Sequence, residues 1–158
     1  MSLVPLWLTI FGVIGPFVLT PLQAQAQPAR DRVLGDVELT EYPEAVQIRV
    51  GFNFPVRYQG HFPTEKGEEL RVQLAPIAVG QVDRDALFQR ESYTPPAPNL
   101  AGVNEILFEG DMRSGFYLTL FFRGEAHWQV TQGSDYRSLQ IEIAAPFPAQ
   151  QGEVKREM

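Results

Sequence analysis

The chain has 158 residues, of which 44% are hydrophobic. This is enough for one domain with a hydrophobic core but too few for two domains of ordinary size. Its 13 Lys and Arg against 19 Asp and Glu give a formal net charge of −6, which disfavours a nucleic-acid partner or a polybasic membrane anchor, because both need clustered positive charge. The absence of cysteine excludes disulfides, thiolate zinc sites, iron–sulfur clusters and cysteine nucleophiles. We therefore expect one globular unit, and nothing in its composition names a reaction.

The N-terminal segment differs in composition from the rest of the chain. No charged residue precedes Arg30, and Leu3 to Leu19 form an apolar run shorter than the roughly 20 residues that cross a bilayer as a helix. The segment ends in Ala24-Gln25-Ala26, the small-x-small pattern that signal peptidase reads. We expect residues 1–26 to be a signal peptide that is cleaved after Ala26, leaving a periplasmic chain without a membrane span. An uncleaved anchor is the alternative.

Alternation with period two dominates the first half of the remaining chain. Apolar residues occupy every second position from Val46 to Tyr58, which is typical of half-buried strands. Gly51 to Pro55 should divide this run into two short strands or kink one, since proline cannot donate to a strand ladder. A further strand is predicted over Leu70 to Leu74, preceded by a turn at Lys66-Gly67.

The second half of the chain repeats this pattern. Val46, Ile48, Val50 and Phe52 correspond to Phe116, Leu118, Leu120 and Phe122 at an offset of 70, and Leu70, Val72 and Leu74 correspond to Leu139, Ile141 and Ile143 at an offset of 69. Any two amphipathic strands alternate alike, but the shared order, spacing and closing proline favour duplication. We therefore predict an all-β fold, a small β-sandwich of two pseudo-symmetric halves.

The domain boundaries follow from these patterns. They are a domain at 35–146, halves at about 37–76 and 103–146, a connector at 77–102 and a tail at 147–158. Within the connector we expect one short helical turn between Asp83 and Glu91. Ser92 to Asn99 is rich in proline and is expected to be an extended, polyproline-like linker. The polar, aperiodic tail is expected to be disordered.

The sequence contains no convincing catalytic or metal-binding constellation. His61 and His127 each lack a second histidine four residues on and are expected to be ordinary surface residues. No serine lies in a nucleophile-elbow motif. The acid pairs Glu68-Glu69 and Asp83/Asp85 are better explained as solvated charges than as the carboxylates of a glycosidase. We expect no enzyme activity, no metal and no cofactor.

The polar phase of the strands mixes arginines with aromatic side chains. The candidate ligand-binding residues are Arg49, Arg57, Arg71, Tyr117, Phe121 and Arg123. Guanidinium groups and aromatic rings together can bind carboxylated or sugar-containing chains through bidentate hydrogen bonds and stacking. The competing interpretation is ordinary surface arginine paired with Glu38, Glu44 or Glu142. Trp128 and Tyr58 lie on the apolar phase and are expected in the core.

The segments Pro55-Val56-Arg57-Tyr58, Glu69 to Pro76 and Arg137 to Ile143, in this order, resemble the AMIN family of bacterial periplasmic domains. The resemblance spans roughly Val37 to Ala145. It implies a small, internally pseudo-symmetric sandwich that targets envelope proteins to peptidoglycan or to the septum or pole. On this basis we expect a non-catalytic module that binds peptidoglycan or an envelope complex.

Two other functions are compatible with the sequence. The chain could be an accessory subunit of a larger envelope assembly, held by a strand edge, by the proline-rich connector or by an exposed apolar patch that includes Phe121 and Phe147. A wall or polysaccharide hydrolase would rest on the acid pairs alone.

Overall fold

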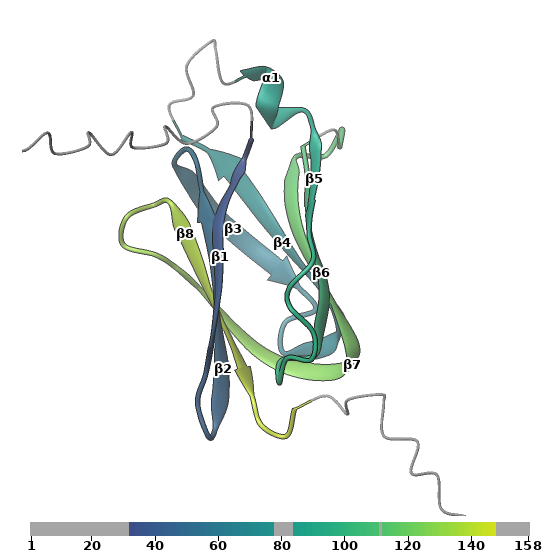
Figure 1. Cartoon of the computed structure of the whole chain (residues 1–158). Coiled ribbons are helices and arrows are strands. Elements are labelled where there is room, and N and C mark those ends of the chain that lie inside the picture. Colours follow the sequence, from purple (N-terminus) through teal and green to yellow (C-terminus); the bar gives the residue numbers. More distant parts are fainter. Residues whose placement is uncertain (1–31, 78–83, 111, 148–158) are drawn as a thin grey trace, which may run out of the picture.

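A computed structural model describes residues 32–77, 84–110 and 112–147 (Figure 1). Within these ranges the chain forms eight strands and one helical turn: β1 Leu34–Glu41, β2 Ala45–Phe52, β3 Val56–Phe62, β4 Lys66–Pro76, α1 Arg84–Leu87, β5 Arg90–Tyr93, β6 Val103–Glu109, β7 Phe116–Gln132 and β8 Ser138–Ala144. The all-β class is confirmed. The predicted signal peptide at 1–26 and residues 148–158 of the predicted tail lie outside the described residues.

The strands form one antiparallel sheet that folds over onto itself. Their order is β1-β2-β8-β7-β4-β3, and β6 pairs with β7 while β5 pairs with β6. Residues 116–122 of β7 pair with β4 and β6, Ala126 and His127 pair with the start of β4, and residues 127–132 pair with β8. We call β1, β2, β8 and residues 127–132 the first layer, and β3 to β6 with residues 116–122 the second layer. In Figure 1 the first layer lies at left, β5 and β6 lie at right, and β7 runs from the right side across to the left.

The inward-facing side chains of both layers meet in one hydrophobic core. Successive side chains of a strand point to opposite faces, so the predicted apolar phase supplies this core. Its largest fully buried members include Ile48, Leu70, Ile106, Phe108, Leu118, Leu120, Leu139, Ile141 and Ile143. Trp128 is buried as expected, and its ring stacks on Phe122 with centroids 5.6 Å apart. Tyr58 is half-buried against the same core.

The strand registers repeat at the offsets found in the sequence. β2 pairs with β8 so that Ile48 lies opposite Ile141. β7 pairs with β4 so that Leu118 lies opposite Val72. Leu118 is the equivalent of Ile48 at an offset of 70, and Ile141 is the equivalent of Val72 at an offset of 69. The last strand of each half therefore pairs with the other half: β8 pairs with β2 of the first half, and β4 pairs with β7 of the second half.

Each half also begins with a strand, β1 or β6, and these two strands occupy equivalent positions. β1 pairs with β2, and β6 pairs with β7, at matching positions: Leu34 lies opposite Phe52, and Val103 lies opposite Phe122. An irregularity in the register follows Leu34 and also follows Val103. Because a bulge is a specific local feature, its recurrence at equivalent positions supports the internal duplication. The sequence alternation alone predicted neither β1 nor β6 as a strand.

The halves differ where β2 is followed by β3. A break at Asn53 to Pro55 separates these strands, as the proline predicts, whereas the equivalent residues of the second half run on as the 17-residue β7. This uninterrupted strand joins the layers, so the sandwich is one folded sheet. The predicted turn within Pro63 to Glu68 falls at Pro63 to Glu65 and not at Lys66-Gly67, because Lys66 and Gly67 belong to β4 and lie opposite His127 and Ala126.

The described part of the connector between the halves, from Arg84 on, is more ordered than a plain linker. The predicted helical turn is present as α1, and Ser92 and Tyr93 pair with β6 as part of β5 instead of starting a linker. Asn99 is buried, and its amide donates to the carbonyls of Pro96 and Val103 while its side-chain oxygen accepts the N–H of Val103. These bonds satisfy backbone groups of Pro96 and Val103 and tie the proline-rich segment to the start of β6.

The predicted exposed patch of Phe121 and Phe147 is not found. Phe147 packs against the core, and Phe121 is only partly exposed. Within the described residues, the large apolar side chains that are exposed are Tyr42, Phe62, Phe88, Met112 and Tyr136. The sequence could not show this, because the side of the molecule on which a residue after the last strand packs depends on tertiary contacts.

Candidate functional site

Four of the six predicted ligand-binding residues lie on one surface, the outer side of the second layer. Arg57 is on β3, Arg71 on β4, and Tyr117 and Phe121 on β7. All four alternate with buried residues and therefore point away from the core. We call this outer side the second-layer face.

The other two predicted residues lie elsewhere and have structural partners. Arg49 is on the first layer, where its Nη2 lies 3.6 Å from Oδ2 of Asp135. Arg123 donates from Nη2 to the carbonyl of Asn99 at 2.9 Å, and its backbone N–H donates to Gly102. Arg123 therefore holds the connector against β7. The competing interpretation of paired surface arginine fits Arg49, although its partner is Asp135.

Asp135 lies in the turn between β7 and β8, where neighbouring groups stabilise its ionised carboxylate. The backbone N–H of Arg137 donates to its Oδ1 at 2.8 Å, and the hydroxyl of Ser138 donates to the same oxygen at 2.9 Å. The Arg137 hydrogen bond, with Ser138 and the nearby Arg49 guanidinium, lowers the pKa of the Asp135 carboxyl. Asp135 thus stabilises the turn between β7 and β8, and Arg49 assists it from β2.

Cross-strand pairing assembles the second-layer face in rows. Gln73 lies opposite Gly60 on one side and Tyr117 on the other, and Tyr117 lies opposite Glu109. In the next row Arg71 lies between Phe62 and Thr119. Residues directly opposite one another on antiparallel strands have neighbouring side chains. The face therefore brings aromatic, cationic and amide groups from three strands together.

Glu109 organises the charges of this face and was not predicted from the sequence. Glu109 is only 8% exposed, and its carboxylate accepts hydrogen bonds from Nη2 of Arg90 at 2.8 Å and from the hydroxyl of Thr119 at 3.2 Å. Arg71 Nη2 lies 3.4 Å from Oε2 of Glu109. Thr119 is also buried, although it points outward, because these side chains cover it. The only sequence feature that could have indicated Glu109 was its alternation with Phe108 in an unrecognised strand.

Arg71 and Tyr117 border a shallow groove at the centre of the face. The guanidinium carbon of Arg71 lies 4.3 Å from the centroid of the Tyr117 ring, within the range of a cation–π contact. The groove has a volume of about 290 Å³ and is lined by Gly60, His61, Phe62, Arg71, Gln73 and Tyr117. Phe62 is 75% exposed at its edge. A stacked guanidinium, an amide and exposed rings can together bind a polar ring or a carboxylate.

The equivalent surface of the first layer has different chemistry. Gln47, Arg49 and Gly51 stand at the positions of Tyr117, Thr119 and Phe121, at an offset of 70. At an offset of 69, Glu38 on β1 is the equivalent of Leu107. On β8, Gln140 is the equivalent of Arg71, and Glu142 is the equivalent of Gln73. The duplication therefore preserves the core but not the outer faces, and the aromatic side chains gather on the second layer.

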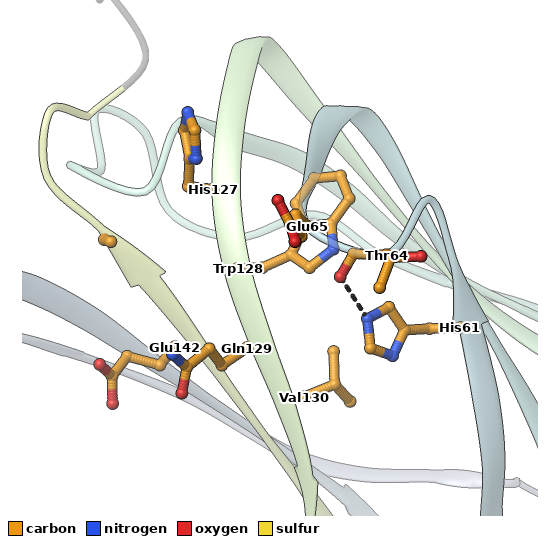
Figure 2. Close-up of a pocket in the computed structure, with 9 residues that line it drawn as sticks. His61, Thr64, Glu65, His127, Trp128, Gln129, Val130 and Glu142 are labelled. Atoms are coloured by element: carbon orange, nitrogen blue, oxygen red, sulfur yellow. Dashed lines mark hydrogen bonds between the residues drawn. The ribbon is translucent and has the colours of Figure 1, made fainter.

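A larger hollow, of about 540 Å³, lies where β7 passes from one layer to the other, and Figure 2 shows its lining. It includes both histidines, Glu65 and Glu142. His61 Nε2 donates to the carbonyl oxygen of Thr64 at 2.9 Å, so in the neutral ring Nδ1 accepts the hydroxyl proton of Tyr58. Burial raises the pKa of that tyrosine hydroxyl above its ordinary value. His61 therefore orders the turn after β3.

The remaining candidates for chemistry do not assemble into a site. Glu68 and Glu69 are both exposed, and the side chains of Asp83 and Asp85 lie outside the described part of the chain. Among the side chains that the structure describes, no group of three His, Cys, Asp or Glu residues is arranged to hold a metal ion. Trp128 lines the larger hollow, but its indole N–H donates to the carbonyl of Pro63 at 3.1 Å.

No family model, curated protein or solved structure matches this chain. The AMIN resemblance therefore stays a prediction from sequence. Of the helical residues that the structure describes, none belongs to a helix with the length and hydropathy needed to span a membrane.

Proposed function

We propose that this protein is a non-catalytic module of the bacterial cell envelope that binds peptidoglycan through the second-layer face. The observation that carries the proposal is the asymmetry between the two outer faces. The core positions of the halves match, whereas Tyr117 and Phe121 stand where the first layer has Gln47 and Gly51. Packing does not require aromatic side chains on an outer face, so their gathering on one layer indicates a binding role.

The chemistry of the face suits a polysaccharide. Sugar rings present C–H faces that pack on aromatic rings, and hydroxyls that bond to planar polar groups. Phe62 and Tyr117 supply the rings, while Arg71 and Gln73 supply the polar groups. The shallow groove spans β3, β4 and β7 and has room for one sugar ring of the polymer. The predicted export of the chain to the periplasm would bring it to the wall.

An accessory subunit held by strand-edge pairing is less well supported. β3 pairs on one side with β4, and two of its backbone N–H groups already have acceptors: Val56 donates to the carbonyl of Tyr136, and Tyr58 donates to Oε1 of Gln132. Near the edge strand β1, the carboxylate of Glu91 accepts the N–H groups of Val33 and Leu34. These acceptors disfavour the addition of a partner strand along β3 and at the start of β1.

Co-sedimentation of the purified protein with isolated peptidoglycan sacculi tests the proposal. We expect the wild type to sediment with the sacculi and Phe62→Ala to bind less. Phe88→Ala is the matched control, because Phe88 is 63% exposed but follows α1, away from the groove lining. Wild-type protein that stays in the supernatant would overturn the proposal. Equal loss of binding in both variants would remove the second-layer face as the site.

A further inference from the structure

The groove beside Arg71 has the properties of an anion receptor. We propose that it binds a free carboxylate of the wall polymer, with the Arg71 guanidinium as the receptor group. This inference rests on the proposed function, because it names the chemical group that the second-layer face recognises. The groove volume of about 290 Å³ is near the lower limit for a small-molecule site and fits one substituted ring better than a long segment.

The guanidinium of Arg71 is held in one position. The Tyr117 ring supports one of its faces, and Glu109 lies 3.4 Å from Nη2. Its Nε is buried and has no hydrogen-bond partner among the described residues. The side chain as a whole is 35% exposed, so part of it remains accessible from the groove. A fixed, planar donor group loses little rotamer freedom on binding, which favours recognition of a carboxylate.

The charge of the cluster leaves Arg71 incompletely neutralised. Glu109 is the carboxylate between two guanidinium groups, and its shorter contact, 2.8 Å, is with Arg90. Two guanidinium groups against one carboxylate carry a net positive charge, although the whole chain is acidic. Glu69, the next outward residue on β4, is exposed and lies opposite Phe121, in a different row of the face. A ligand carboxylate would therefore complete the charge balance.

The other groove residues leave space for such a ligand and add uncharged contacts. Gly60 has a φ of 154°, and a Cβ built there would meet no atom within 4 Å, so the backbone is open to the groove. A residue with a side chain at this position would strain the backbone and fill that space. Gln73 offers an amide, and Phe62 offers an exposed ring.

Free carboxylates in a cell wall come from two sources, the peptide stems and the lactyl groups of glycan strands that have lost their stems, because an attached stem blocks the lactyl carboxyl as an amide. Three preparations separate these sources: intact sacculi, sacculi whose carboxyls have been converted to amides, and glycan strands stripped of peptide. The proteins compared are the wild type, Arg71→Gln and Arg49→Gln. The Arg49 variant is the matched control, because it removes the same charge from the first layer, where the pairing with Asp135 is exposed.

We expect the wild type to bind amidated sacculi about tenfold more weakly than intact sacculi, the size of one charge-assisted hydrogen bond. Arg71→Gln should bind both preparations equally weakly, and Arg49→Gln should behave as the wild type. Arg71→Lys, which keeps the charge but not the planar fork, should bind intact sacculi less tightly than the wild type and controls for a folding defect. Binding to stripped strands would show that a free lactyl carboxylate is sufficient and that the denuded glycan is a ligand, whereas loss of that binding would assign the carboxylate to the peptide stems; either result supports a carboxylate receptor.

Wild-type binding that is the same for intact and amidated sacculi would overturn the carboxylate inference and leave the proposed function standing. Failure of the wild type to bind intact sacculi would instead overturn the proposed function, and the inference with it.

Discussion

Arg71 and Tyr117, on the neighbouring strands β4 and β7, form a stacked pair in which the guanidinium carbon lies 4.3 Å from the ring centroid. The equivalent positions on the first layer hold Gln140 and Gln47, which cannot form such a stack. The two halves thus share a core and strand registers but carry different outer faces. This difference is the basis of the predictions that concern the binding face.

Glu109→Gln should destabilise the protein and loosen the second-layer face. The substitution removes the negative charge that Arg71 and Arg90 share, in a site where the carboxylate is nearly buried. We expect a loss of about 1–3 kcal/mol, measured by urea unfolding. Glu105→Gln is the control, since Glu105 accepts the Ser92 hydroxyl at an exposed position and its loss should cost less than about 0.5 kcal/mol. Equal effects of the two substitutions would contradict the role given to Glu109.

Glu91→Ala should free the start of β1. The Glu91 carboxylate accepts the backbone N–H groups of Val33 and Leu34, and the alanine would leave both buried donors without a partner. We expect a loss of about 2 kcal/mol in unfolding free energy and faster hydrogen exchange at these two amides. Glu41→Ala, which removes the exposed acceptor of the Leu100 N–H, should have a smaller effect. Unchanged exchange at Val33 and Leu34 would show that Glu91 does not hold this strand.

Gln132→Ala should weaken the contact between β3 and the end of β7. The Gln132 side chain accepts the N–H of Tyr58 and donates to the carbonyl of Ser138 at 3.1 Å, so it joins β3 to the start of β8. We expect a loss of about 1 kcal/mol and faster exchange at the Tyr58 amide. Gln129→Ala, at an exposed position of the same strand, is the control. Retained protection at Tyr58 would mean that the side chain does not cap this edge.

Asp135→Asn should change the acid dependence of stability. The pKa of Asp135 is lowered in the folded state, so its ionised form stabilises the fold at pH values above the usual aspartate pKa of about 4. This contribution is lost as the pH falls through the lowered pKa. The melting temperature of the wild type should therefore exceed that of the variant at neutral pH, and the difference should vanish at low pH. A difference that is constant from pH 7 to pH 2 would contradict this account.

The sequence was sufficient to predict the core because its signal is local. Strict alternation identified Val46 to Val50 and Leu70 to Leu74, and the offset of about 70 predicted which strands are equivalent. β6 was missed because the irregularity after Val103 interrupts its alternation, and β5 was missed because it has four residues and follows α1. Both are recognised as strands only through their pairing with distant segments.

The candidate site was only partly predictable. Arg71 and Tyr117 could be assigned to the outward phase, but their contact depends on the register between β4 and β7, which the sequence does not state. Glu109 was missed together with its strand. Arg123 was assigned to the same site because phase alone cannot distinguish an outward arginine that contacts ligand from one that holds a neighbouring loop, here at Asn99.

Titration of the isotope-labelled protein with soluble peptidoglycan fragments, followed through its backbone amide shifts by NMR, shows whether the second-layer face binds the wall polymer. We expect the largest changes at the groove residues Gly60, Phe62, Arg71, Gln73 and Tyr117, and little change at the first-layer equivalents Gln47 and Gln140. Changes concentrated on the first layer, or no changes at saturating fragment, would contradict the proposed binding.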